Sequence, residues 1–456
     1  MAFGRTSGDA LPGLGWLGII RIGLVQASIG ALVMLSTTVF NRLMVVEYGL
    51  AAGIPAGLVA WHYGVQLTRP LWGHGSDQGR KRAPWIMGGL AILASGALLG
   101  AYITPLMAGS FATGIALAII AYTLIGLGVG MGGTSALALL ASGVAPQRRA
   151  AAAATTWIMM VAGIVISAIV VGQLIDPYSP QRLFTVACGL AAVTIAICAL
   201  ATFRLEHPLG QGHVTFEETR KDEPAPGFGE ALSEIWNETA ARRFTIFIFV
   251  SMIAFSMQDL ILEPFAGLVF GMSPGESTQL GGQHQGGILL GMIVAGVGGS
   301  AFKGKLTSNL RLWVIAGCLL SALALAALAL AAVIGPGWPL QANVIVLGLG
   351  NGLFAVAAIG SMMGLAGAGK KTREGVRMGV WGASQAIAFG TGGLLGALGV
   401  DFARGAMGQD GPAFQIIFTA EAALFVLAAG LAVQATGRGA IAPKRPEGAK
   451  TEVVGI

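Results

Sequence analysis

Charge is scarce in this sequence, and its scarcity excludes a water-soluble globular protein. Only 11% of the 456 residues are charged, whereas soluble domains carry about 25%. Hydrophobic residues make up 55% of the chain. Water cannot solvate so much apolar surface, so the composition indicates a polytopic membrane protein.

Cysteine and histidine are also rare, with three and five residues respectively. Cys188, Cys198 and Cys318 lie in apolar stretches without paired spacing, which excludes a disulfide framework and a thiolate metal site. The sequence also lacks a phosphate-binding loop, a zinc motif and a Ser-His-Asp constellation. We therefore expect no enzyme activity and neither a nucleotide nor a redox cofactor.

Long apolar stretches, by contrast, are abundant. A helix of about 20 apolar residues crosses a hydrocarbon layer of about 30 Å, and the sequence predicts twelve such helices. The predicted spans cover residues 17–46, 54–72, 84–107, 112–140, 150–174, 182–203, 243–271, 282–302, 311–334, 339–366, 374–400 and 412–436.

The distribution of lysine and arginine predicts the orientation of these spans. Cytoplasmic loops of membrane proteins carry an excess of both residues. With both termini in the cytoplasm, most cations fall on that side, and the outer side keeps only Arg42, Arg182 and Arg404. The net positive charge of the chain then reflects its insertion into the membrane and its contact with anionic lipids, rather than binding to nucleic acid.

One long polar segment divides the spans into six and six. The predicted organisation is a cytoplasmic N-terminal segment, a six-helix bundle, a cytoplasmic linker, a second six-helix bundle and a cytoplasmic tail. Their boundaries are residues 1–16, 17–203, 204–242, 243–436 and 437–456.

The two halves also match each other at an offset of 222 to 225 residues. Gly126–Gly130 lies over Gly348–Gly352, and His62 lies over His284. Asp176 lies over Asp401. A shared offset indicates a duplicated six-helix unit. Because both halves start on the same side, the repeats are parallel, as in the major facilitator fold.

The turn after the second span resembles the signature loop of major facilitator proteins. It contains Gly73, Asp77 and Gly79, followed by the basic run Arg80, Lys81 and Arg82. Glycines permit a tight turn, and an aspartate can receive a helix terminus. One residue is missing between Asp77 and Gly79 relative to that signature.

Several blocks of the chain closely resemble the PucC and LhaA family of photosynthetic bacteria. The blocks are Phe40–Glu47, His62-Tyr63, Arg69-Pro70, Gly73–Asp77, Pro84–Ile86 and Gln258–Pro264. The resemblance covers residues 15 to 435. It implies a major-facilitator-like protein that assembles light-harvesting complexes, either by delivering bacteriochlorophyll to antenna apoproteins or by chaperoning their assembly.

The resemblance also implies the partners and the location. The expected partners are antenna polypeptides, and further candidates are the reaction centre and pigment-synthesis enzymes. The expected location is the bacterial cytoplasmic membrane, in its intracytoplasmic photosynthetic part. Two alternatives stay open: an alternating-access transporter of a small amphipathic solute, and a scaffold that clamps antenna helices without touching pigment.

Charged residues near the outer ends of the first and seventh spans form a candidate gate. Arg42 and Glu47 are five residues apart, about 140° around an α-helix, so we expect no pairing along one face. Asp259 and Glu263 are four apart and share a face. We expect Arg42 to pair with Asp259 or Glu263 and so to close the outer side. The alternative is a static network that fixes helix packing.

His62 and His284 are candidate ligands for the magnesium of bacteriochlorophyll, the one metal that we expect this protein to meet. A neutral imidazole can supply an axial ligand from within an apolar helix. The alternative for each is a histidine that hydrogen-bonds a backbone carbonyl or a neighbouring helix.

Overall fold

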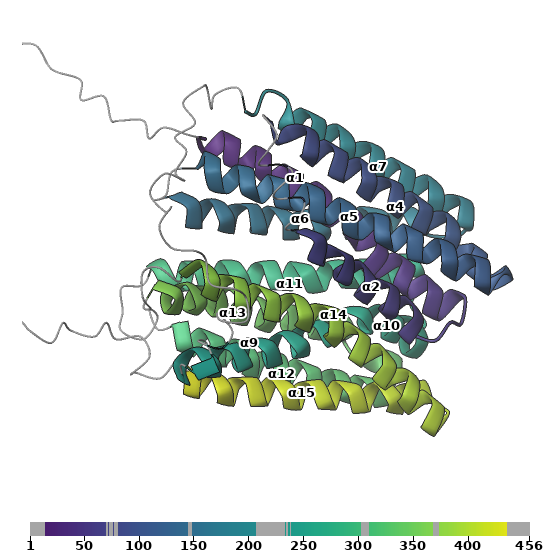
Figure 1. Ribbon diagram of the computed structural model, residues 1–456. Helices are drawn as coiled ribbons and strands as arrows, with labels where there is room; N and C mark the ends of the chain where they lie inside the picture. The colour runs from purple at the N-terminus through teal and green to yellow at the C-terminus, as the bar shows by residue number, and fades with distance from the viewer. Residues whose placement is uncertain are drawn as a thin grey trace, which may run out of the picture.

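The computed structural model describes residues 14–69, 72, 76, 81–144, 148–206, 233, 236–237, 239–301, 310–367 and 374–435. These residues form helices and the turns that connect them, and no strand occurs among them. The helices run side by side in two bundles (Figure 1). The purple to blue bundle comes from the first half of the chain and the green to yellow bundle from the second.

Among the described residues, the first bundle contains six helical runs. The first run is α1 (Trp16–Met34) with its continuations η1 (Leu35–Phe40) and η2 (Leu43–Glu47), and the second is α2 (Gly53–Val65) with η3 (Gln66–Thr68). The other four are α4 (Ala83–Gly109), α5 (Phe111–Gly143), α6 (Arg149–Ile175) and α7 (Pro180–Thr202).

The second bundle begins with a broken helix. The helix α9 (Thr239–Met257) leads through η6 (Gln258–Leu260) into α10 (Leu262–Phe270). The remaining elements are α11 (Pro274–Ala301), α12 (Leu310–Ile334), η7 (Gly335–Gly337), α13 (Leu340–Gly367), α14 (Glu374–Met407) and α15 (Asp410–Ala435).

The described part of the chain holds nine helices that are long and apolar enough to cross a membrane. The protein is therefore a multi-pass membrane protein, as the composition indicates. Each of the nine coincides with a predicted span. In the other three predicted spans the structure has the helices α2, α11 and α14, which do not satisfy both criteria within the described residues.

Glycine allows close helix contact inside each bundle. A side chain at Gly128 of α5 would collide with the backbone of Leu93 and Gly89 in α4. A side chain at Gly352 of α13 would collide with the Ile288 carbonyl of α11. Small residues of this kind let membrane helices approach to backbone contact.

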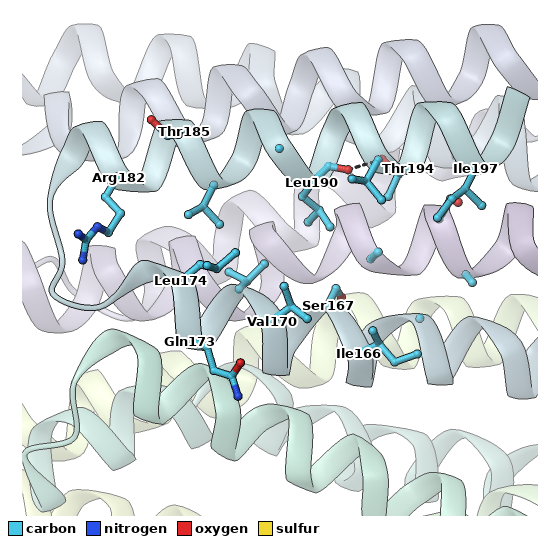
Figure 2. A pocket seen from close by; sticks show the side chains of 18 of the residues that line it. Ile166, Ser167, Val170, Gln173, Leu174, Arg182, Thr185, Leu190, Thr194 and Ile197 are labelled. Carbon is cyan, nitrogen blue, oxygen red and sulfur yellow. Dashed lines mark hydrogen bonds between the residues drawn. The ribbon is translucent and has the colours of Figure 1, made fainter.

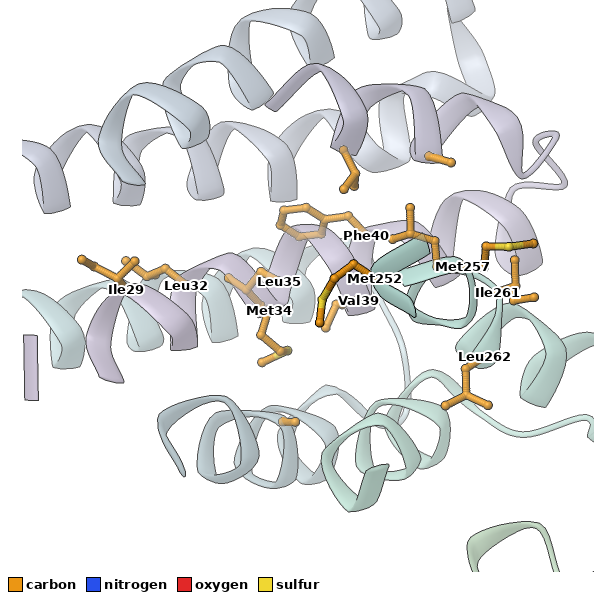
Figure 3. Packing of buried hydrophobic residues seen from close by; sticks show 14 of the residues in the cluster. Ile29, Leu32, Met34, Leu35, Val39, Phe40, Met252, Met257, Ile261 and Leu262 are labelled. Atoms are coloured by element: carbon orange, nitrogen blue, oxygen red, sulfur yellow. The ribbon is translucent and has the colours of Figure 1, made fainter. Parts of the chain in front are cut away.

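The bundles meet along two helix pairs, α6 with α11 and α2 with α14. Between them lies an apolar core to which α1, η1, α9 and α10 contribute (Figure 3). Leu35, Phe40 and Ile261 are fully buried there. The Phe40 ring packs at Gly100 of α4, where a Cβ would lie 2.6 Å from its Cε2 atom. This core lies beside the charged residues near the ends of the first and seventh spans, on the side of the molecule that is predicted to face outward. We call that side the outer side and the opposite one the inner side.

Candidate functional site

The first span ends in π-helical turns, and these bring Arg42 and Glu47 together. The Tyr48 amide donates to the Leu43 carbonyl at 3.0 Å, an i to i+5 bond. In a π-helix this bond closes each turn, so side chains five apart face the same way. Arg42 Nη1 forms a salt bridge with Glu47 Oε1. The prediction that these residues do not pair is wrong, because it assumed α-helical geometry.

Arg42 is 2% exposed and also reaches the second bundle. Its Nη2 donates to the Met272 carbonyl at 2.6 Å. The side-chain Nδ2 of the neighbouring Asn41 donates to the Leu260 carbonyl at 2.7 Å. Within the described residues its carboxylate partner is Glu47. The expected ion pair with Asp259 or Glu263 is therefore absent from this structure, and backbone carbonyls link the first span to the seventh instead.

Asp259, which is half-buried, and Glu263, which is buried, belong to an acidic cluster. Glu263 is 4% exposed, and its carboxyl group and the Thr38 side chain of η1 both lie beside Gly281. Its Oε2 has no hydrogen-bond partner among the described residues. A side chain at Gly281 would collide with Glu263 Oε1, so glycine leaves room for the carboxyl group.

Glu421 of α15 is the third member, and sequence reasoning missed it. It is fully buried, lies within electrostatic range of Asp259, and neither of its oxygens has a partner among the described residues. An isolated carboxyl group inside an apolar span is costly and usually functional. This signal was present in residues 412–436, where Glu421 is the only charged residue.

Both candidate pigment ligands are buried between helices. His62 is 1% exposed, with Nδ1 3.2 Å from the Val59 carbonyl and Nε2 2.8 Å from Gln66 Nε2. His284 is 3% exposed, and its Nε2 lies 3.3 Å from Asn351 Nδ2. Gln66 lies one turn away and its Oε1 accepts a hydrogen bond from Arg69, so freeing His62 Nε2 requires Gln66 to rotate and that bond to break.

Two aspartates from opposite bundles bind helix N-termini across the outer seam. Asp401 of α14 accepts hydrogen bonds from the amides of Ala52, at 2.9 Å, and Gly53, at 2.6 Å, where α2 begins. Asp176, after α6, accepts from the Ser273 hydroxyl and, at 3.0 Å, from the Gly275 amide, where α11 begins. Helix N-termini attract carboxylates because their amides lack partners. We call these two contacts the reciprocal caps.

A tyrosine pair joins two outer turns within the first bundle. The hydroxyls of Tyr48 and Tyr178 are 2.6 Å apart. Burial raises the pKa of Tyr48, and the negative charge of Glu47 raises it further against the effect of the hydrogen bond. Burial also raises the pKa of Tyr178, and the hydrogen bond with Tyr48 acts in the same direction.

The structure describes only a few residues of the signature loop, chiefly those at its end. Gly73, Asp77, Gly79 and Arg80 lie outside the described residues, whereas Lys81 is exposed and Arg82 half-buried. The amides of Arg82 and Ala83 donate to the carboxylate of Glu206 at 2.8 and 3.1 Å. A carboxylate therefore binds the N-terminus of α4 on the inner side, within one bundle.

Comparisons with known proteins give matches that extend over nearly the whole chain. A model of the PUCC protein family matches residues 39–439. A Rhodobacter capsulatus protein named bacteriochlorophyll synthase 44.5 kDa chain is 48% identical over 423 residues, which cover 92% of this chain and 95% of that protein. Protein PucC of Rhodobacter capsulatus is 29% identical over 445 residues and 92% of each chain.

A solved structure shares the fold. The nucleoside transporter NupG matches with a TM-score of 0.63 over 91% of this chain and 99% of its own, at 15% identity. At that identity the likeness shows the fold alone, which is major-facilitator-like.

Proposed function

The chain belongs to the PUCC protein family, and on that premise we propose that it assembles light-harvesting complexes by delivering or inserting bacteriochlorophyll into antenna apoproteins. The observation that carries the proposal is the 48% identity, over 92% of the chain, to a protein named for bacteriochlorophyll. We further propose the intracytoplasmic photosynthetic membrane as its location. Antenna polypeptides are its partners in this proposal, with the reaction centre and pigment-synthesis enzymes as further candidates.

The proposal includes twelve spans in two parallel six-helix repeats with both termini in the cytoplasm. The reciprocal caps support the repeat, because Asp176 and Asp401 correspond at the sequence offset and bind the starts of α11 and α2. The boundaries 17–203 and 243–436 for the two bundles belong to the same proposal.

His62 is the better supported pigment ligand of the two histidines. Ligation at His62 requires that Gln66, which also accepts a hydrogen bond from Arg69, turn away. Ligation at His284 requires the same of Asn351, which accepts a hydrogen bond from Ser321 and is fully buried, whereas Gln66 is 8% exposed. Bound pigment should be lost in His62→Ala and retained in His284→Ala. Unchanged near-infrared absorbance of purified His62→Ala would remove His62 from the proposal.

Purification from a pigmented host tests the function itself. Co-purification of bacteriochlorophyll together with antenna polypeptides is the outcome expected for delivery. Antenna polypeptides without pigment would support the scaffold, and absence of both would contradict assembly. Deletion of the gene should lower the light-harvesting absorbance of whole cells, and the intact gene in trans should restore it.

The acidic cluster favours one second candidate, alternating-access transport of a small amphipathic solute. Asp259, Glu263 and Glu421 lack a basic partner among the described residues, and unpaired carboxyl groups at membrane depth often mark a substrate or proton path. Uptake into proteoliposomes that Glu421→Gln abolishes would support transport. Equal antenna assembly by Glu421→Gln and the wild type would favour the first proposal.

The protein acts in this proposal as an assembly factor rather than as an enzyme, and the transporter-like fold supports that choice. The word synthase belongs to the name of the Rhodobacter capsulatus relative. Pigment formation by the purified protein from its biosynthetic precursors would contradict a non-enzymatic role.

A further inference from the structure

A groove opens on the lateral surface of the first bundle, between α6 and α7. Its cavity volume is about 960 Å³, and α1 forms its floor (Figure 2). Most of its lining is apolar, including Val170 and Leu174 of α6 and Val193 of α7, which are 46%, 55% and 56% exposed. In a multi-pass membrane protein such side chains face lipid.

The groove exists because α6 and α7 barely touch although they are consecutive. Their predicted repeat counterparts in the second bundle, α14 and α15, pack against each other more extensively. The last two helices of the first bundle therefore contact each other less than those of the second bundle do. Gly189 of α7 lines the groove, and a Cβ at that position would meet no atom within 4 Å.

Arg182 lies at the outer end of the groove, near the start of α7 (Figure 2). Of the three outer arginines, Arg42 pairs with Glu47, and Arg404 pairs with Asp410 at 2.6 Å. Arg182 instead donates to the Pro177 carbonyl at 3.0 Å and has no carboxylate partner among the described residues. Asp176 also lines the groove, but its carboxylate already accepts hydrogen bonds from Ser273 and Gly275 of the second bundle.

We propose that this groove is a binding site for one anionic phospholipid. The acyl chains lie between α6 and α7 against α1, and the phosphate binds the guanidinium of Arg182. Arginine matches phosphate with paired, charge-assisted hydrogen bonds.

The lining favours a phospholipid over a magnesium tetrapyrrole. The ring metal of such a pigment needs an axial ligand, and no histidine is among the described residues that line the groove. The hydroxyls of Ser28, Ser167 and Thr194 on the walls already donate to backbone carbonyls of their own helices. A net negative charge, which the neutral pigment lacks, is what complements Arg182.

Two variants test the site by different means. Gly189→Phe places a phenyl ring in the groove at a position where a Cβ would meet no atom within 4 Å. Gly430→Phe is its matched control, since Gly430 is an exposed glycine of α15 at which a Cβ would also meet no atom within 4 Å. Arg182→Met removes the charge but keeps the apolar stem, and Arg404→Met is its control on the same side.

The measurement is the phospholipid retained by protein purified in mild detergent, quantified by mass spectrometry, with pigment absorbance recorded on the same samples. We expect Gly189→Phe and Arg182→Met to retain about tenfold less anionic phospholipid than the wild type, as befits loss of a charged hydrogen bond. Both controls should match the wild type.

Equal retention in all five proteins would overturn the proposal. So would a loss of zwitterionic lipid in the same proportion, because the site would then lack charge selectivity. Loss of pigment instead of phospholipid in Gly189→Phe would assign the groove to the tetrapyrrole and also overturn it. If Gly189→Phe does not fold, Arg182→Met alone decides between these outcomes.

Discussion

At the scale of single residues, the buried guanidinium of Arg42 depends on one carboxylate. Its side chain is 3% exposed and that of Glu47 is 34% exposed. The pair therefore lies between a surface salt bridge and a buried one. Loss of the carboxylate leaves a desolvated charge whose remaining described acceptor is the Met272 carbonyl.

Glu47→Ala should lower stability by about 1–3 kcal/mol, between the values typical of exposed and buried pairs. The thermal midpoint of the detergent-purified protein measures the change. Asp410→Ala is the control, because its pair with Arg404 is about one-third exposed on both sides and should contribute about 1 kcal/mol or less. Equal shifts in the two variants would contradict the special role of Arg42.

The tyrosine pair predicts a pH dependence at the outer surface. Burial raises the pKa of both Tyr48 and Tyr178 in the folded protein, whereas an unfolded tyrosine titrates near pH 10. Their contribution to stability is therefore complete below about pH 10 and is lost as the pH rises through the folded values.

Thermal midpoints measured between about pH 8 and 11 should fall in the wild type above pH 10. The fall should be smaller in the double variant Tyr48→Phe with Tyr178→Phe. Tyr102→Phe is the control, because Tyr102 is 58% exposed. Its thermal midpoint should depend on pH as that of the wild type does. A double variant with an unchanged profile would show that other groups titrate.

Residue identity alone predicted the charged positions but not their partners. Arg42, Glu47, Asp259 and Glu263 stand out in apolar sequence, yet partner choice depends on a local π-helical turn that residue spacing does not reveal. Glu421 was within reach of the same reasoning, since a lone carboxyl group in an apolar span is visible in the sequence.

At the scale of helices, nine of the twelve predicted spans coincide with long apolar helices of the described residues, because length and apolarity are strong signals. The sequence also aligned Asp176 with Asp401 but assigned no role to either. The role could not be predicted, because each carboxylate caps a helix from the other half of the chain, and that contact exists only after the halves pack.

Asp176→Ala and Asp401→Ala should each lower stability by about 0.5–2 kcal/mol, as expected for loss of a helix cap. Each should also expose the outer seam. Asparagine at either position keeps an acceptor oxygen and should have a smaller effect. Thiol labelling of Met272→Cys from the outer side, in a variant without the three native cysteines, measures the opening.

Glu206→Ala provides the matched control, because Glu206 caps α4 on the inner side and within one bundle. It should lower the thermal midpoint without faster labelling at position 272. Faster labelling in this variant as well would mean that general loosening, rather than release of the outer seam, exposes that site.

At the scale of the whole molecule, noncovalent contacts join the two bundles in addition to the covalent chain. Asn41, Arg42 and the reciprocal caps all cross between them. In addition, α6 packs with α11 and α2 with α14. These contacts should hold two separately made halves together.

Co-expression of residues 1–222 and 223–456 as separate chains should yield a complex that co-purifies through a tag on either half. Asp176→Ala combined with Asp401→Ala should reduce the yield of that complex, while Glu206→Ala should not. Halves that never associate, although each is present in the membrane, would show that the covalent linker is required.

The reciprocal caps make opening of the outer side a cooperative event. Each bundle contributes one aspartate and one helix start, so a rotation that separates the bundles must break both contacts together. With about 1 kcal/mol for each cap, the pair biases the equilibrium towards the closed form by roughly thirtyfold. A form in which only one cap is broken loses that contact while the other cap still restrains the bundles, so it should be sparsely populated. The outer face should therefore switch between a closed and an open state.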